Sequence, residues 1–190
     1  MIKAQYEDKR LVVEILTTSF QDNQSVNYVI NRGRSRNQRI SRLMEYSFHY
    51  CKMFGEVFLS DDRNACALAV FPDRKKANLK SIFLDVKLAL TCIGISNLKK
   101  AINREARIKT THPPSPIYYI WFIGVRPEFQ NRGVGSALLS EIIEKSESMQ
   151  RPLYLETSTL RNLPWYKKFG FEVHNELDFG YNLFCLKRER

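Results

Sequence analysis

A strand, a turn and a glycine-bearing loop lead directly into a helix between residues 117 and 143, and this unit constrains the fold more than any other feature. Residues 117–125 are continuously apolar or aromatic, which predicts a strand buried on both faces. Pro127 marks a turn, and the loop Gln-Asn-Arg-Gly-Val-Gly at 130–135 then opens a helix whose apolar residues recur at helical spacing. The predicted strand is therefore connected to the predicted helix by a short loop that contains two glycines.

The loop 130–135 has the composition of an anion-binding site. The first N–H groups of a helix lack partners within the helix, and the helix dipole adds about half a positive charge there. Gly133 and Gly135 let the backbone approach phosphate oxygens, and Arg132 adds a charged fork. A P-loop is excluded because no lysine follows Gly135, and a dinucleotide fingerprint is excluded because its third glycine is missing. A plain turn without a ligand is the competing interpretation.

In this context the chain resembles the GCN5-related N-acetyltransferase (GNAT) superfamily. The family motif Gln/Arg-x-x-Gly-x-Gly/Ala is matched by Gln130, Gly133 and Gly135, directly after a strand that ends in Val125-Arg126-Pro127. A second match resembles the family's fifth strand, the following helix and the closing Tyr-x-x-x-Gly-Phe motif. It consists of Leu155-Glu156-Thr157-Ser158, Asn162-Leu163-Pro164-Trp165-Tyr166 and Gly170-Phe171-Glu172-Val173. The resemblance is specific over residues 117–187, permissive over 1–72 and uninformative over 74–112.

The resemblance implies a GNAT-like acyl-CoA N-acyltransferase fold in the α/β class. We expect one domain over residues 1–190, with a mixed, mostly antiparallel, splayed sheet flanked by helices and a helical insertion at 74–112. In the family the fourth and fifth strands diverge, the pantetheine arm of acetyl-CoA enters the gap, and backbone amides hold the pyrophosphate. The cofactor-binding residues expected on this basis are Ile123, Gly124, Val125, Gln130, Asn131, Arg132, Gly133, Val134, Gly135, Ser136 and Asn162. For Asn162, capping the helix that follows is a further role.

The implied activity is acetyl-CoA-dependent transfer of an acetyl group to a primary amine of a small molecule or peptide, by direct attack on the thioester. Tyr166 matches the family tyrosine beside the cofactor sulfur and is the expected general acid, although packing against its aromatic neighbours is the alternative. Many family members carry a glutamate near the position of Trp121, where this strand has no acid. The general base therefore stays open between a water chain, Glu156 and His112. We expect His112 at the surface and Glu156 in a structural role, facing across the sheet.

Two other function classes remain beside the enzyme. The absence of an acidic residue in the fourth strand is consistent with a non-catalytic module that senses coenzyme A. A nucleic-acid-binding protein fits the charge, because 30 Lys and Arg stand against 20 Asp and Glu, but no recognisable nucleic-acid motif is present. Five arginines lie within residues 32–42, where the family's first helices border the acceptor pocket. They select an acidic acceptor or decorate a solvated helix face.

Residues 74–112 form a second basic segment with its own helical pattern. Ile82, Phe83, Val86, Leu90 and Ile93 fall on one face of a helix that ends at Gly94, and a second helix is predicted at 97–108. We expect this helical pair to pack on the domain by its apolar stripe. A helix lying on a membrane surface is the alternative.

Elsewhere, periodicity and turn residues predict a regular alternation of elements. Residues 21–35 are polar and predict a loop that includes about one turn. The expected elements are a strand at 2–5, helices at 8–20 and 35–54, a hairpin of 56–60 with 66–71, a strand at 152–157, a short helix at 163–169 and a terminal antiparallel pair of 171–175 with 181–186.

The cysteines and the hydropathy of the sequence indicate the redox state, metal content and cellular location that we expect. Four cysteines are scattered without a C-x-x-C pair or histidine spacing, so we expect reduced thiols and no metal. No apolar run reaches the roughly 18 residues of a membrane span, and the first ten residues lack the apolar stretch of a secretory signal. We expect a cytoplasmic location, acetyl-CoA and an amine acceptor as partners, and neither a membrane nor nucleic acid. A homodimer stays open.

Overall fold

The computed structural model describes residues 1–30, 35–76 and 78–189, which form a mixed sheet with helices on both faces. Its seven strands follow the order β1-β2-β3-β4-β5-β7-β6, and every neighbouring pair is antiparallel except β4 and β5. The strands are β1 (Ile2–Lys3), β2 (Gly55–Leu59), β3 (Ala65–Val70), β4 (Tyr118–Val125), β5 (Leu153–Thr157), β6 (Glu172–Asp178) and β7 (Asn182–Arg188). The predicted α/β class with a mixed, mostly antiparallel sheet is confirmed.

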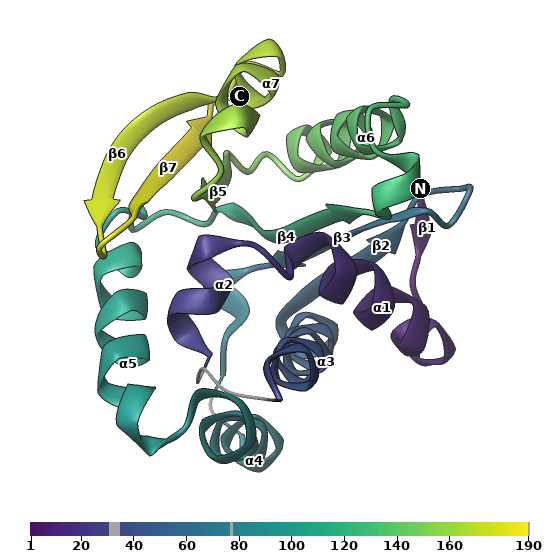
Figure 1. The fold of residues 1–190 in the computed structure, drawn as a ribbon. Coiled ribbons are helices and arrows are strands. Elements are labelled where there is room, and N and C mark those ends of the chain that lie inside the picture. The colour runs from purple at the N-terminus through teal and green to yellow at the C-terminus, as the bar shows by residue number, and fades with distance from the viewer. Residues whose placement is uncertain (31–34, 77, 190) are drawn as a thin grey trace.

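Helices cover the two faces of the sheet and create two separate apolar cores (Figure 1). One face carries α1 (Lys9–Phe20) and α3 (Arg36–Phe54), and the other carries α6 (Val134–Ser148) and α7 (Leu163–Lys168). A short helix, α2 (Gln24–Val29), lies within the predicted loop 21–35, where Asn23 caps it by accepting a hydrogen bond from the Val26 N–H at 3.0 Å. The polar sequence concealed this helix, because only Val26 of its residues is buried.

The sheet splits between β4 and β5. Only Tyr118 with Leu153 and Tyr119 with Tyr154 are paired between these strands. Beyond that point β4 continues to Val125 against β3 alone, while β5 continues to Thr157 against β7. Figure 1 shows β4 running toward α6 while β5 departs with β7 and β6. This divergence is the splayed arrangement that the sequence led us to expect.

A bulge at Trp121 reverses the faces of β4. The register with β3 pairs Ala69 with Ile120 and Leu68 with Phe122, which leaves Trp121 without a partner. Before the bulge, Tyr119 and Trp121 pack toward α1 and α3. After it, the core that includes α6 and α7 receives Ile123 and Val125. The prediction that both faces of β4 are covered is confirmed, since Tyr118 and Ile120 are buried in one core and Phe122 in the other, while the four residues named above are only partly buried.

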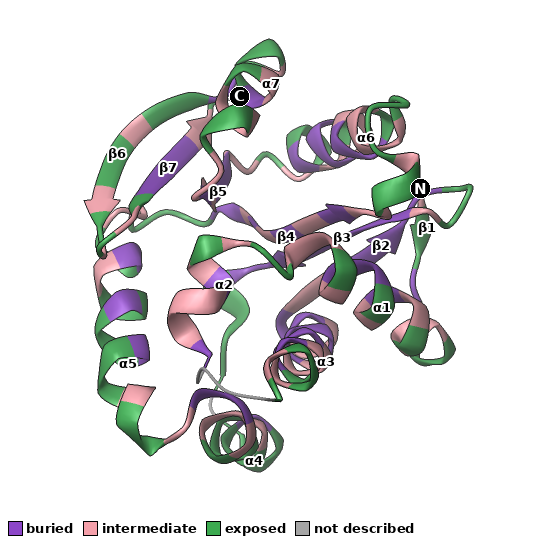
Figure 2. Cartoon of the chain, in the orientation of Figure 1, coloured by how far each residue is buried: buried purple, intermediate pink, exposed green. Residues whose placement is uncertain are grey.

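Residues 79–109 form the two predicted helices, but their apolar stripe does not pack on the domain. Helix α4 (Leu79–Leu88) continues through a π-helical turn (Ala89–Ile93), and α5 (Ile95–Lys109) follows after Gly94. Of the predicted stripe, Ile82, Phe83, Val86 and Leu90 are exposed and Ile93 alone is buried. Figure 2 colours α4 mainly as exposed or intermediate. The expectation of a packed stripe is wrong because α4 also carries Leu84 and Leu88 at its other side, and these residues face α3. Helical periodicity does not distinguish two apolar faces.

Candidate active site

The glycine loop ends in a helix start with open amide groups. Asn131 and Gly133 both adopt left-handed backbone conformations, with φ of 60° and 83°. Helix α6 begins at Val134, and its first turn closes when the Ala137 N–H donates to the Gly133 carbonyl at 2.9 Å. Among the described residues, no side chain caps this helix. The N–H groups at the start of α6 are therefore free to face an anion.

Gly135 brings the start of α6 against the end of β4. A Cβ at this position would lie 3.0 Å from Cγ2 of Val125, so only glycine allows this approach without movement. Gly133 has open space around it and is needed for its backbone conformation alone. The loop is also tied to the strand by Gln130, whose Nε2 donates to the Val125 carbonyl at 3.2 Å. Arg132 within the loop is exposed, as an anion-binding role requires.

The end of β4 offers a backbone edge beside this loop. Ile123, Gly124 and Val125 pair with Ala67, Cys66 and Ala65 of β3, and in the described chain no strand pairs with them on the β5 side. The Val125 carbonyl is held by Gln130 and by Ser19, whose hydroxyl donates to it at 2.8 Å. An extended ligand can follow this edge as an additional strand would. The structure thus brings the predicted strand end and the predicted loop together.

Tyr166 lies on the same side of the sheet as the loop. Its side chain is 5% exposed, and its ring packs 4.7 Å from Trp165 and 5.6 Å from Phe171 between centroids. Trp165 Nε1 donates to the Ser136 hydroxyl at 3.0 Å, which fastens α7 to the start of α6. Burial raises the pKa of Tyr166 well above its ordinary value. The phenol therefore stays protonated near neutral pH, as a proton donor must.

Asn162 ends a short 3-10 turn (Leu160–Asn162) immediately before α7. Its side chain is half-buried and makes no capping hydrogen bond to α7. The capping role considered from the sequence is therefore wrong, because Asn162 already has helical backbone angles. Its amide group remains available to a ligand.

A buried carboxylate occupies the opposite face of the divergence. Glu156 is 7% exposed, it accepts a hydrogen bond from the Tyr119 hydroxyl, and its Oε1 lies 3.1 Å from Nε2 of His112. The His112 ring also packs 4.9 Å from the Tyr119 ring. Burial and the nearby Glu156 carboxylate raise the pKa of Tyr119, so this phenol stays neutral and donates. Tyr119, Glu156 and His112 form the cluster that we call the acceptor-side triad.

The expectation that His112 lies at the surface is wrong, since its side chain is only 13% exposed. The end of α5 is fastened to the end of β6, where Arg107 Nη1 donates to the Asp178 carbonyl at 2.8 Å. His112 follows three residues after the end of α5 and lies against Glu156 of β5. The proline-rich run after it gave no sign of this fold-back, because proline predicts only irregular backbone.

Beside the acceptor-side triad lies a buried arginine that the sequence did not single out. Arg104 of α5 donates to the Tyr181 hydroxyl at 3.1 Å and to the Ser25 hydroxyl, and it pairs with Glu105 at 2.6 Å. These residues come from α2, from α5 and from the position just before β7. No spacing rule links such distant positions, so only the tertiary structure reveals this group.

Two of the five arginines within residues 32–42 bind the π-helical turn that follows α4. Arg39 donates to the Cys92 carbonyl at 3.3 Å, and Arg42 donates to the Thr91 carbonyl at 3.0 Å. Arg36 instead binds Asn27 at 2.9 Å, while residues 31–34, with Arg32 and Arg34, lie outside the described residues. Two of the five thus stabilise the C-terminal end of the π-helical turn, a role that neither sequence interpretation included.

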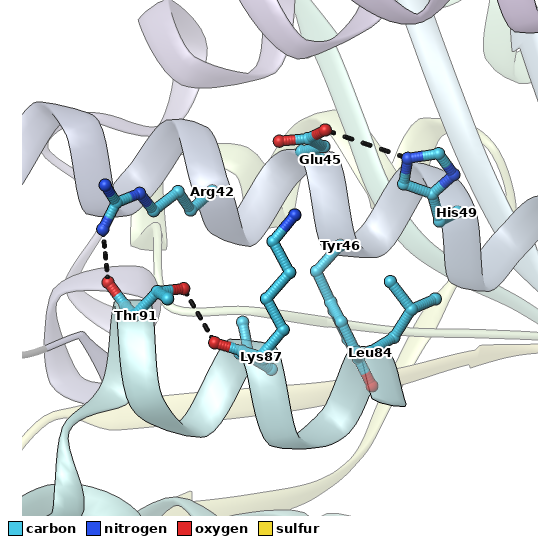
Figure 3. Close-up of a pocket in the computed structure, with 8 residues that line it drawn as sticks. Arg42, Glu45, Tyr46, His49, Leu84, Lys87 and Thr91 are labelled. Carbon is cyan, nitrogen blue, oxygen red and sulfur yellow. Dashed lines mark hydrogen bonds and ion pairs between the residues drawn. The ribbon is translucent and has the colours of Figure 1, made fainter. Parts of the chain in front are cut away.

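Two hollows of the surface are lined by residues outside the loop 130–136 and the acceptor-side triad. A crevice of about 20 Å³ separates α3 from α4, and a broad depression lies near Gln150 and Pro116. Figure 3 shows the crevice, which Glu45, Tyr46 and Lys87 help to line. Within the described residues, no group of three or more His, Cys, Asp or Glu side chains is arranged to hold a metal ion.

A family model described as an acetyltransferase (GNAT) domain matches residues 92–173 of the chain. S-alkylcysteine N-acetyltransferase of Bacillus subtilis (strain 168) is 31% identical over 70 residues, which cover 34% of this chain and 39% of that relative. The match therefore spans well under two thirds of the relative's length.

Solved structures extend the likeness to the whole chain. The structure described as histone acetyltransferase HPA2 and related acetyltransferase from Corynebacterium glutamicum ATCC 13032 has a TM-score of 0.69 at 16% identity, covering 99% of this chain and 94% of that one. The C-terminal condensation domain of Ebony, in complex with beta-alanyl-dopamine, has a TM-score of 0.70 at 13% identity, covering 100% and 97%. At such identities the likeness concerns the fold.

Proposed function

Residues 92–173 match a GNAT acetyltransferase family model, and we propose on this basis that the chain is a GNAT acetyltransferase that transfers an acetyl group from acetyl-CoA to a primary amine of a small molecule or peptide. One observation carries the proposal: β4 parts from β5 directly beside the uncapped start of α6. This arrangement supplies an anion site and a free strand edge next to each other, which a ligand with a polyphosphate and an extended amide-bearing arm requires.

The residues present fit acetyl-CoA, which would supply an acetyl group activated as a thioester. The backbone amides of the loop and the α6 start, from Asn131 through Val134 to Ser136, would hold the pyrophosphate, with Arg132 adding charge. Ile123, Gly124 and Val125 would present their backbone edge to the pantetheine arm. Asn162 would contact that arm from the other side. Gly135 supports this fit, because a Cβ there would meet Val125.

Acyl transfer needs a polarised carbonyl and a proton for the departing thiolate. A backbone N–H near Val125 would polarise the carbonyl, as preorganised donors do in other acyl-transfer sites. Tyr166 would give its proton to the sulfur. The raised pKa of Tyr166 supports this role, because the phenol is protonated at the pH where an amine nucleophile is partly neutral.

Transfer also needs a base, and Glu156 with His112 would serve as one in place of the strand-four glutamate. In this role Glu156 would accept the hydrogen bond as a carboxylate, and Nε2 of His112 would carry the proton between them. The lone pair is then on Nδ1, which would accept a proton from the incoming amine. Glu156 would act as a positioning residue that fixes the tautomer of His112, as carboxylates do for catalytic histidines.

Thiol release with acetyl-CoA and a panel of primary amines tests the proposal. We expect release of coenzyme A that depends on both the enzyme and an amine, with an acetylated amine as the second product. Binding of acetyl-CoA without turnover on any amine would favour the non-catalytic sensing module. A group of apolar, acidic and basic amines in the panel would also indicate which acceptor chemistry the site prefers.

A further inference from the structure

The outer side of α4 presents a stripe of apolar side chains to solvent. Leu79, Ile82, Phe83, Val86 and Leu90 recur at helical spacing and lie on one face. Leu79 is 87% exposed and Phe83 is 67% exposed. Ile95 and Ile102 of α5 are exposed as well. Isolated apolar residues are common on surfaces, but a continuous stripe of this kind marks an interaction site.

This outer stripe is not a core face that has failed to pack. The other side of α4 already contacts α3, where the Tyr46 hydroxyl donates to Asp85 at 2.6 Å. Arg39 and Arg42 hold the following carbonyls, and Cys92 is buried. The crevice between the two helices is only about 20 Å³, room for roughly one water molecule (Figure 3). Helix α4 is therefore fixed with its stripe outward.

The charge of the segment complements an anionic surface. Residues 74–109 contain ten Lys and Arg but only Asp85 and Glu105 as acids, which accounts for +8 of the net charge of +10. Both acids have partners, Tyr46 and Arg104 respectively. Lys76, Lys80 and Lys99 are exposed, and none of them forms an ion pair with any described residue. Free lysines thus border an exposed apolar stripe.

We propose that the outer stripe of α4, with the start of α5, docks on an anionic lipid bilayer. A basic helix with an apolar face lies in the interface plane, where apolar side chains enter the acyl boundary and lysines meet the headgroups. No single described helix is long and apolar enough to cross a membrane; α4 with its π-helical turn and α5 pass that test only as a pair bent by 119°. This geometry suits lying on a bilayer. The proposal departs from the expectation, drawn from the sequence, of no membrane partner.

A second copy of the chain fits this face less well than lipid does. A symmetric dimer places the same surface against itself, so the net +8 segments of the two copies would face one another. Like charges in contact oppose association, and the segment has no spare acid to offset them. An anionic bilayer supplies both apolar volume and opposite charge.

Vesicle flotation with the full chain tests the docking. We expect the protein to float with vesicles of phosphatidylcholine and phosphatidylglycerol, and to bind pure phosphatidylcholine at least tenfold more weakly. Phe83→Ser with Val86→Ser should weaken partitioning by at least tenfold, and Lys76→Gln with Lys80→Gln by severalfold. Leu160→Ser with Val173→Ser is the matched control, because it removes exposed apolar groups elsewhere and should leave partitioning unchanged.

A second readout reports the orientation on lipid. Phe83→Trp places an indole in the stripe, and its emission should shift to the blue when anionic vesicles are added. Failure of the folded protein to bind anionic vesicles would overturn the proposal, and so would equal binding by the stripe variant and the control. A dimer in solution that Phe83→Ser with Val86→Ser dissociates would assign the stripe to a second copy instead. These tests need no acetyl transfer, so their failure is distinct from failure of the proposed function.

Discussion

The two sides of the divergence between β4 and β5 are built in different ways. On one side, the loop 130–136 and the end of β4 offer mainly backbone groups from one continuous stretch of chain. On the other side, Tyr119, Glu156 and His112 meet through side chains from separate segments, with Arg104 of α5 beside them. A backbone site needs glycines at fixed spacing and is therefore visible in the sequence. A side-chain site depends on how distant segments meet.

The largest expected effect tests the chemistry on the loop side. Tyr166→Phe should lower kcat by roughly two to three orders of magnitude, because it removes the proton for the thiolate. Affinity for acetyl-CoA should stay within about twofold, since the aromatic ring still fills its place. Burial raises the pKa of Tyr166, so the phenol stays protonated near neutral pH. Deprotonation of Tyr166 should therefore not lower the wild-type rate in that pH range. Steady-state kinetics over a pH series, with a separate binding titration, checks both points.

Tyr118→Phe is the matched control for Tyr166→Phe. Tyr118 is also a buried tyrosine, and burial together with the nearby Glu56 carboxylate raises its pKa. Loss of the Tyr118 hydroxyl should leave kcat unchanged. Equal rates for wild type and Tyr166→Phe would remove Tyr166 from the mechanism and leave it as packing.

The next effect tests whether the loop side depends on close backbone approach. Gly135→Val should weaken acetyl-CoA binding by about 100-fold, or roughly 2.8 kcal/mol, because the new side chain collides with Val125 and displaces the α6 start. Ala137→Val is the control, since Ala137 is exposed two residues further along the same helix. Titration calorimetry on both variants makes the measurement. Unchanged affinity in Gly135→Val would break the assignment of this loop to the cofactor.

A smaller effect tests whether the acceptor side acts as one unit. His112→Gln and Glu156→Gln should each lower kcat/KM for the amine by about 10- to 100-fold at neutral pH, because both changes remove the base or its orientation. The double variant should be no slower than the slower single variant, since groups that act together are not additive. Independent, multiplying losses would contradict the pairing. Acetyl-CoA affinity should stay constant throughout and so separates the two sides.

The smallest effect concerns the point where β4 and β5 are still joined. Arg151 holds Asp73 through two hydrogen bonds, at 2.6 and 2.9 Å, and also donates to the Ile117 carbonyl at 3.2 Å. The Arg151 guanidinium lowers the pKa of Asp73, so this pair stabilises the fold above the ordinary carboxyl pKa and the gain is lost as pH falls through the lowered value. Because Asp73 is about one-third exposed, Asp73→Asn should cost at most about 1 kcal/mol near neutral pH.

Urea unfolding of wild type and Asp73→Asn at neutral and acidic pH checks this sign. The difference in unfolding free energy should shrink as the pH falls, and turnover at neutral pH should be unchanged. A difference that grows in acid would show that Asp73 is not stabilised as an anion.

Most of the architecture followed from local patterns, while the exceptions share one physical cause. Periodicity located the helices and strands, and glycine spacing located the loop, because these signals lie within a few neighbouring residues. The bulge at Trp121, the outward stripe of α4 and the largely buried position of His112 depend on contacts with β3, α3 and the end of β6. Residue type alone also gave no warning that Arg39 and Arg42 would bind carbonyl groups of the insertion. Tertiary contacts decide such features.

Titration of folded, cofactor-free protein with acetyl-CoA in a calorimeter tests the central claim most directly. The claim is that the start of α6 and the open edge of β4 together form a coenzyme A site. It predicts one-to-one binding with a micromolar dissociation constant for wild type and a loss of about 100-fold for Gly135→Val. Absence of binding to the folded wild-type protein would contradict the claim.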